Sequence, residues 1–111
     1  MTLDELKTWL PTVGFRVCDD NFPRGGATWY AAKRSTIPAR VCETNKDKPG
    51  FQIVVQPHYY HTVHESVTVE VRGEASGIWW AMQAYPLNPV EVRDRLVEIE
   101  ASLVAAWNAL R

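Results

Sequence analysis

The first apolar residues of the chain recur every three or four positions, as on one face of a helix: Leu3, Leu6, Trp9 and Leu10. Thr2 and Glu5 have the spacing of a capping box, in which each side chain binds the backbone N–H of the other residue. Pro11 and Gly14 then interrupt the pattern. The sequence therefore predicts a short helix over about residues 3–10.

Short segments of alternating apolar and polar residues fill the middle of the chain, and clusters of Gly, Pro, Asn and Asp separate them. The pattern predicts six strands: Phe15–Cys18, Thr28–Arg34, Ala39–Thr44, Phe51–Gln56, Ser66–Arg72 and Ile78–Tyr85. A parallel return needs a connection of about a dozen residues or more, and these connections are mostly shorter. We therefore expect the strands to form an antiparallel meander.

The C-terminal segment has the clearest helical pattern. Asn88 is a capping residue, Pro89 suits the first helical position, and Glu91 is an acid at the third. The apolar residues that follow form one broad face, with Val92, Leu96, Ile99, Leu103 and Leu110 at its centre and Val97, Val104, Ala106 and Trp107 at its margins. The pattern predicts an amphipathic helix of about 22 residues, or about 33 Å. This apolar face spans fewer than four heptads and is broader than a coiled-coil seam, so we expect the helix to pack on the sheet.

Together these elements predict a single α+β domain over residues 1–111. It has a short N-terminal helix, an antiparallel meander sheet of five to six strands, and a long C-terminal helix packed on one face of the sheet. No apolar run approaches the ~20 residues that a membrane span requires. The acidic N-terminus lacks the basic and apolar stretches of a signal peptide, so we expect a cytoplasmic protein.

Charge and cysteine content exclude few functions. The net charge is −1, from 12 basic and 13 acidic residues. A general nucleic-acid binder normally has a basic excess, so the net charge argues against nucleic acid as a partner. Cys18 and Cys42 are too few for a disulfide scaffold, and we interpret them as free thiols. No cofactor is predicted.

Aromatic residues on the sheet suggest a contact surface. In Ile78–Tyr85, strict alternation places Trp79 and Tyr85 on the face away from the core, and Trp29 and Tyr30 are adjacent on opposite faces. Trp and Tyr are common at interface hot spots. The last predicted strand is also an edge of the meander, and it contains neither proline nor charge to oppose pairing with another chain. The alternative interpretation is that these aromatics pack beneath a loop, against the first helix or across a closed sheet.

These patterns favour a non-enzymatic protein-binding or adaptor module of the bacterial or phage accessory type. It would act through Trp79, Tyr85, Trp29 and Tyr30, as a homodimer or with another protein. The alternative is a small-ligand-binding protein or enzyme with a cavity between a curved sheet and the C-terminal helix. The aromatic and sulfur-containing residues expected to point inward there are Trp9, Trp80, Met82 and Trp107.

The histidines form a weak candidate for a metal site. His58, His61 and His64 could bind zinc, but their spacing alternates faces on a strand and matches no established zinc pattern. We interpret the segment as a hairpin loop. Nothing in the spacing brings either cysteine beside a histidine for nucleophilic catalysis. Asp19 and Asp20 could be paired catalytic or metal-binding carboxylates, but they lie where a turn begins, so we interpret them as turn-capping residues. No catalytic residue is predicted.

Overall fold

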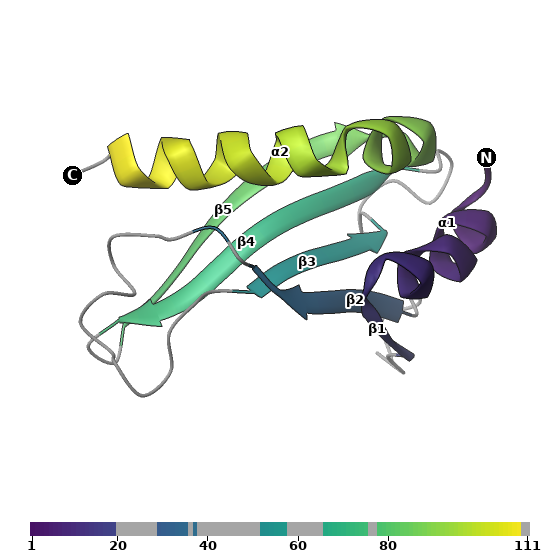
Figure 1. Cartoon of the computed structure of the whole chain (residues 1–111), viewed down its shortest axis with the longest axis horizontal. Coiled ribbons are helices and arrows are strands. Elements are labelled where there is room, and N and C mark those ends of the chain that lie inside the picture. The colour runs from purple at the N-terminus through teal and green to yellow at the C-terminus, as the bar shows by residue number, and fades with distance from the viewer. Residues whose placement is uncertain (20–28, 36, 38–51, 58–65, 76–77, 110–111) are drawn as a thin grey trace.

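The computed structural model describes residues 1–19, 29–35, 37, 52–57, 66–75 and 78–109, with the backbone alone at 74–75 and 78–80. Along the chain the elements are α1 (Leu3–Trp9), the 3₁₀ helix η1 (Leu10–Val13), β1 (Arg16–Asp19), β2 (Trp29–Arg34), β3 (Gln52–Pro57), β4 (Val67–Ala75), β5 (Ile78–Leu87) and α2 (Pro89–Ala109). The strands form one sheet, with the helices on one side of it (Figure 1). This is the predicted α+β architecture.

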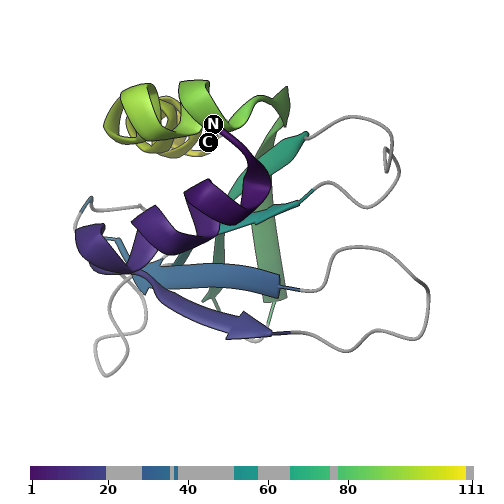
Figure 2. The same ribbon diagram turned by 90° about the vertical axis from the view of Figure 1, so that its right-hand side faces the viewer.

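The sheet is an antiparallel meander in which the described strands lie in chain order, β1-β2-β3-β4-β5. β1 and β5 are therefore its edges. Figure 2 shows that the sheet is strongly twisted, since β1 and β2 run across the view while β4 and β5 run nearly upright. The strand predicted at Ala39–Thr44 lies outside the described residues.

The capping box predicted for α1 is present. Thr2 Oγ1 accepts a hydrogen bond from the Glu5 N–H at 3.1 Å, and Glu5 Oε1 accepts one from the Thr2 N–H at 3.3 Å. The chain continues through Pro11 as η1, and this 3₁₀ helix is capped by Gly14, whose φ of 96° lies in the left-handed region.

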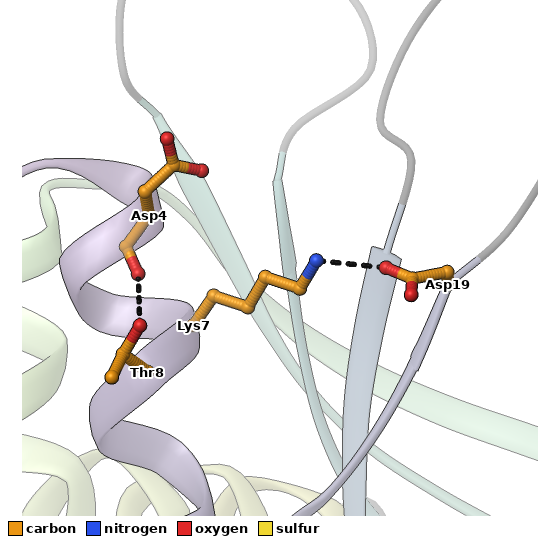
Figure 3. Close-up of polar contacts among 4 residues, drawn as sticks. All are labelled: Asp4, Lys7, Thr8 and Asp19. Atoms are coloured by element: carbon orange, nitrogen blue, oxygen red, sulfur yellow. Dashed lines mark hydrogen bonds and ion pairs between the residues drawn. The ribbon is translucent and has the colours of Figure 1, made fainter.

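Figure 3 shows how α1 is joined to β1. Lys7 reaches from the helix to Asp19 at the end of the strand, and its Nζ lies 2.8 Å from the carboxylate oxygen Oδ1. The Thr8 hydroxyl donates to the Asp4 carbonyl at 3.0 Å within the helix. Both contacts are solvent-exposed, so they add little to stability.

The predicted start of α2 is confirmed. Asn88 Oδ1 accepts from the Glu91 N–H at 2.8 Å, and Glu91 Oε1 accepts from the Asn88 side-chain amide at 2.6 Å. The helix runs over 21 residues and has non-helical dihedral angles at Arg95, with φ −126° and ψ 19°. Val97 was predicted at the margin of the buried face but is 77% exposed. It lies about 100° around the helix from Leu96, beyond the reach of the sheet.

The core lies between the helices and the face of the sheet that they cover, which we call the inner face. Its buried residues are Leu6, Leu10, Phe15, Trp29, Ala31, Ile53, Val55, Val67, Val69, Val71, Val92, Leu96, Leu103 and Val104. The alternation predicted for the valines of β4 is confirmed, because all of the odd-numbered positions from 67 to 71 are fully buried. Met82 and Ala84 of β5 pack against the same core.

The opposite face, which we call the outer face, differs from expectation at its centre. Val54, Thr68 and Glu70 lie on it as the alternation predicts, yet all of them are buried. They belong to the middle strands β3 and β4, each flanked by a strand on both sides. On the same face Gln52 of β3 is exposed, so the burial is confined to these central positions.

β5 is longer than the predicted strand. It extends past Tyr85 to Leu87, so it includes Pro86, and the expectation of a strand without proline is wrong. The pairing with β4 shifts in register between Val67 and Val69, where β5 contributes the additional residue. This irregularity allows Pro86, which has no backbone N–H, to be included near the strand end.

Candidate functional site

The register aligns polar and aromatic residues in a row across the outer face. Gln56 on β3 is paired with Thr68 on β4. Tyr30 lies one position beyond the Ala31–Val55 pair, which places it beside Gln56. Tyr85 lies beside Thr68, at the register shift of β5. The row thus begins and ends with a tyrosine, and the two tyrosines are separated by β3 and β4.

Both of these tyrosines are accessible to solvent. Tyr30 is 36% exposed and Tyr85 is 56% exposed, so two of the four aromatics proposed to bind a partner lie on the surface. Trp29 was also proposed to bind a partner, but it is 4% exposed and belongs to the core. Because adjacent strand residues point to opposite faces, an exposed Tyr30 requires Trp29 to point inward. Trp29 is therefore removed from the candidate surface.

Trp79 is described through its backbone alone. It belongs to β5 and is paired with Glu74 on β4. Its proposed role in binding a partner remains a prediction from the sequence.

The β5 side of the outer face is an exposed, uncharged strip. Ala81, Gln83 and Tyr85 alternate along the strand and are all exposed. Their cross-strand neighbours include Arg72, opposite Ala81, and Glu70, opposite Gln83. Within the described sheet, β4 is the only strand paired with β5, so the other side of β5 is an open edge.

A second accessible region lies at the β1 side of the same face. Here a cleft of about 330 Å³ opens over β1, β2 and the start of β3, and it is lined by Arg16, Cys18, Tyr30, Ala32, Lys33, Arg34 and Gln52. The register pairs Arg16 with Ala32 and Arg34 with Gln52, so the small Ala32 side chain lies between longer ones. None of the lining residues is acidic.

Arginines elsewhere in the described chain are paired with acids. Arg72 contacts Glu70 at 2.9 Å, and two further pairs lie on α2: Arg93–Asp94 at 2.8 Å and Arg95–Glu98 at 3.0 Å. The hydrogen bond and charge of Asp94 raise the pKa of Arg93. In the part of the chain that the structure describes, Arg16 and Arg34 have no acidic partner. In the sequence these two arginines are visible only as charges, and the β1–β2 register is what places them on one face.

A buried carboxylate in the core was also missed. Glu100 is 8% exposed and lies in the middle of the buried face of α2. Its Oε1 accepts a hydrogen bond from the hydroxyl of Ser35, which follows β2 and is 7% exposed. The spacing of Glu100, four residues after Leu96 and three before Leu103, was the available signal. This pair connects the end of β2 to α2.

Most of the remaining candidate residues belong, in the sequence, to the segment between β3 and β4 or to that between β2 and β3. His58, His61, His64 and Cys42 lie outside the described residues. Across the described ranges no three His, Cys, Asp or Glu side chains are grouped to hold a metal ion. Cys18 is a free cysteine. None of the helices described is both long and apolar enough to cross a membrane.

The residues expected around an internal ligand cavity contribute to packing where they are described. Trp9, Met82 and Trp107 pack against the apolar cluster, whereas Trp80 is described through its backbone alone. The cleft of about 330 Å³ lies instead on the outer face.

A comparison of the chain with protein-family models, with curated proteins and with solved structures found no match.

Proposed function

We propose that the protein is a protein-binding module that pairs through the β5 edge with another polypeptide, and that this partner is a second copy of the same chain. The observation that carries the proposal is the accessible, uncharged strip of β5, which combines an open strand edge with the exposed Tyr85. An edge strand presents unpaired backbone N–H and C=O groups, which another strand can satisfy.

The two edges of the described sheet differ in their suitability for pairing. β1 has four residues, and the charged Arg16 and Asp19 stand at its ends. Lys7 also reaches Asp19 from α1. Short length and charge both discourage the addition of a strand. β5 has ten residues and no charged side chain, so of the two edges it is the better suited to pair with another strand.

Pro86 limits where the pairing can occur. Proline cannot donate a backbone hydrogen bond, so the ladder is expected to use the part of β5 before it, residues 78–85. Ala81, Gln83 and Tyr85 then line the outer face along the new ladder. Tyr85 supplies a large apolar area with few rotatable bonds, as is common at interface hot spots.

A second copy is a suitable partner because β5 can pair with itself in an antiparallel, two-fold arrangement. In such an interface the same surface is contributed by both subunits. The absence of charge on β5 means that no like charges are opposed across the two-fold axis. The result would be one continuous sheet across two subunits.

Sedimentation velocity over a range of protein concentrations tests the proposal. We expect the wild-type protein to dimerise and Tyr85→Glu to remain monomeric, because the change places two carboxylates at the interface. Val97→Glu is the matched control, since Val97 is 77% exposed on α2. Urea denaturation of each variant shows whether its fold is intact, and a surface change is expected to alter stability by about 0.5 kcal/mol or less.

Two outcomes would contradict the proposal. One is a wild-type protein that stays monomeric at every concentration. The other is a Tyr85→Glu variant that dimerises as the wild type and the Val97→Glu control do. In another outcome, a different polypeptide co-purifies with the wild-type chain and is lost from Tyr85→Glu. That result would confirm β5 as the binding surface and contradict a second copy of the chain as the partner.

A further inference from the structure

We propose that the cleft between β1 and β2 binds the phosphomonoester group of a small molecule, with Arg16 and Arg34 as its ligands. This inference goes beyond the proposed function, because the cleft lies at the opposite edge of the sheet from β5.

The two arginines lie close together on one face of the sheet. Arg16 is paired with Ala32, and Arg34 is two positions further along the same strand as Ala32. Diagonal neighbours of this kind have Cα atoms separated by roughly 7–8 Å, and long side chains bridge that distance easily. Both guanidinium groups can therefore reach a single ligand placed over Ala32.

Ala32 makes the cleft possible. Its neighbours on the same face of β2 are Tyr30 and Arg34, and Arg16 stands opposite it on β1. A methyl group surrounded by longer side chains leaves a hollow above the sheet. The resulting volume of about 330 Å³ is at the lower end of the range for small-molecule pockets, roughly 300–1,000 Å³. It fits a small ligand rather than an extended chain.

The charge of the cleft specifies an anion. Arg16 and Arg34 have no acidic partner in the described part of the chain, whereas the nearby Arg72 is paired with Glu70. Lys33 is already engaged, since its Nζ donates to the Val13 carbonyl and lies 4.9 Å from the centre of the Phe15 ring.

Two guanidinium charges match a dianion. Arginine forms two parallel hydrogen bonds with phosphate oxygens through its planar fork. A phosphomonoester has a charge of about −1.5 to −2 at neutral pH, which two arginines neutralise. Gln52 is paired with Arg34 across the strands and brings an uncharged side-chain amide to the same rim.

The probes are inorganic phosphate and phenyl phosphate, added to ¹⁵N-labelled full-length protein at constant ionic strength and followed by two-dimensional NMR. We expect saturable shifts in the amides of β1, β2 and the start of β3. Sodium chloride is the control for non-specific ion effects. Tighter binding of phenyl phosphate would identify an organic phosphomonoester as the ligand, and equal binding would identify free phosphate.

The variants Arg16→Gln and Arg34→Gln should each weaken phosphate binding by about tenfold or more, because each loses a charge-assisted hydrogen bond. Arg93→Gln is the matched control, since it removes one positive charge from an ion-paired arginine on α2. Shifts that do not saturate, or equal losses of affinity in all of these variants, would overturn the proposal. Tyr85→Glu should bind phosphate as the wild type does, so this site can fail or hold independently of the β5 interface.

Discussion

The contact between Ser35 and Glu100 should contribute strongly to the attachment of α2. The Glu100 carboxylate lies in the buried face of the helix and accepts a hydrogen bond from the Ser35 hydroxyl. The Ser35 oxygen in turn accepts a hydrogen bond from the Ile37 N–H at 3.1 Å. A buried carboxylate that loses its donor bears the full cost of desolvation, so the two side chains should be energetically coupled.

The expected loss in free energy of unfolding follows from the burial of both Ser35 and Glu100. A hydrogen bond to a charged group contributes about 1.5–3 kcal/mol, so Ser35→Ala should lower the free energy of unfolding by about 2 kcal/mol. Glu100→Leu removes the charge and leaves an apolar side chain of similar size in an apolar surrounding, with an expected loss of about 1 kcal/mol or less. The destabilisation of the double variant should exceed that of Glu100→Leu only by the smaller loss of the Ile37 N–H hydrogen bond, because no buried carboxylate remains to be satisfied. The coupling energy in the double-mutant cycle is then about 2 kcal/mol.

Urea denaturation of the wild type, the two single variants and the double variant measures this coupling. Thermal unfolding gives a second readout, and Ser35→Ala should lower Tm by about 8 °C at roughly 4 °C per kcal/mol. Ser102→Ala is the control, because Ser102 is exposed on the same helix. The reasoning would be refuted if Ser35→Ala were as mild as Ser102→Ala, or if the losses of the two single variants simply added in the double variant.

Two further changes test the local structure. Gly14→Ala should lower the free energy of unfolding by about 1–2 kcal/mol, because alanine is strained at the φ of 96° that Gly14 adopts. A steric clash is not the cause, since an added Cβ would meet only Lys33 Cδ at an ordinary 3.9 Å. An unchanged urea midpoint would contradict this backbone origin. Asn88→Ala should lower the free energy of unfolding by about 1 kcal/mol, because the α2 cap is lost, whereas Asn88→Ser keeps a capping oxygen and should lower it much less. Equal thermal midpoints for both variants would show that capping is not responsible.

The elements with strong local signals were predictable from the sequence. The capping box at Thr2 and the Asn88–Pro89 start of α2 each depend on residues within a few positions of one another, and both are confirmed. The alternation in β4 identified its buried valines for the same reason, since a strand has a side-chain period of two. Local chemistry determined these features.

The features that depend on the three-dimensional arrangement were not predictable. Trp29 and Tyr30 were separated correctly onto two faces, but the sequence did not show which face would be covered. The inclusion of Pro86 in β5 depends on the register shift opposite β4, which no local pattern reveals. The burial of Glu70 on the outer face was not predictable either, because the alternation of β4 places it on the side expected to face solvent.

The cleft was missed for the same reason. Arg16 and Arg34 are 18 positions apart in the sequence, and only the β1–β2 register brings them together over Ala32. The absence of acidic partners, as judged over the described residues, is a property of the folded molecule. A count of charges along the chain could suggest a basic region but not a site.

Hydrogen–deuterium exchange at high and low protein concentration tests the pairing of β5 most directly. Backbone amides that form a ladder with a second copy are protected only while the dimer persists. We predict that amides within residues 78–85 exchange faster after dilution, while those of β1, residues 16–19, do not change. Exchange of β5 that is independent of concentration, or protection that changes with concentration at β1 instead, would contradict the account.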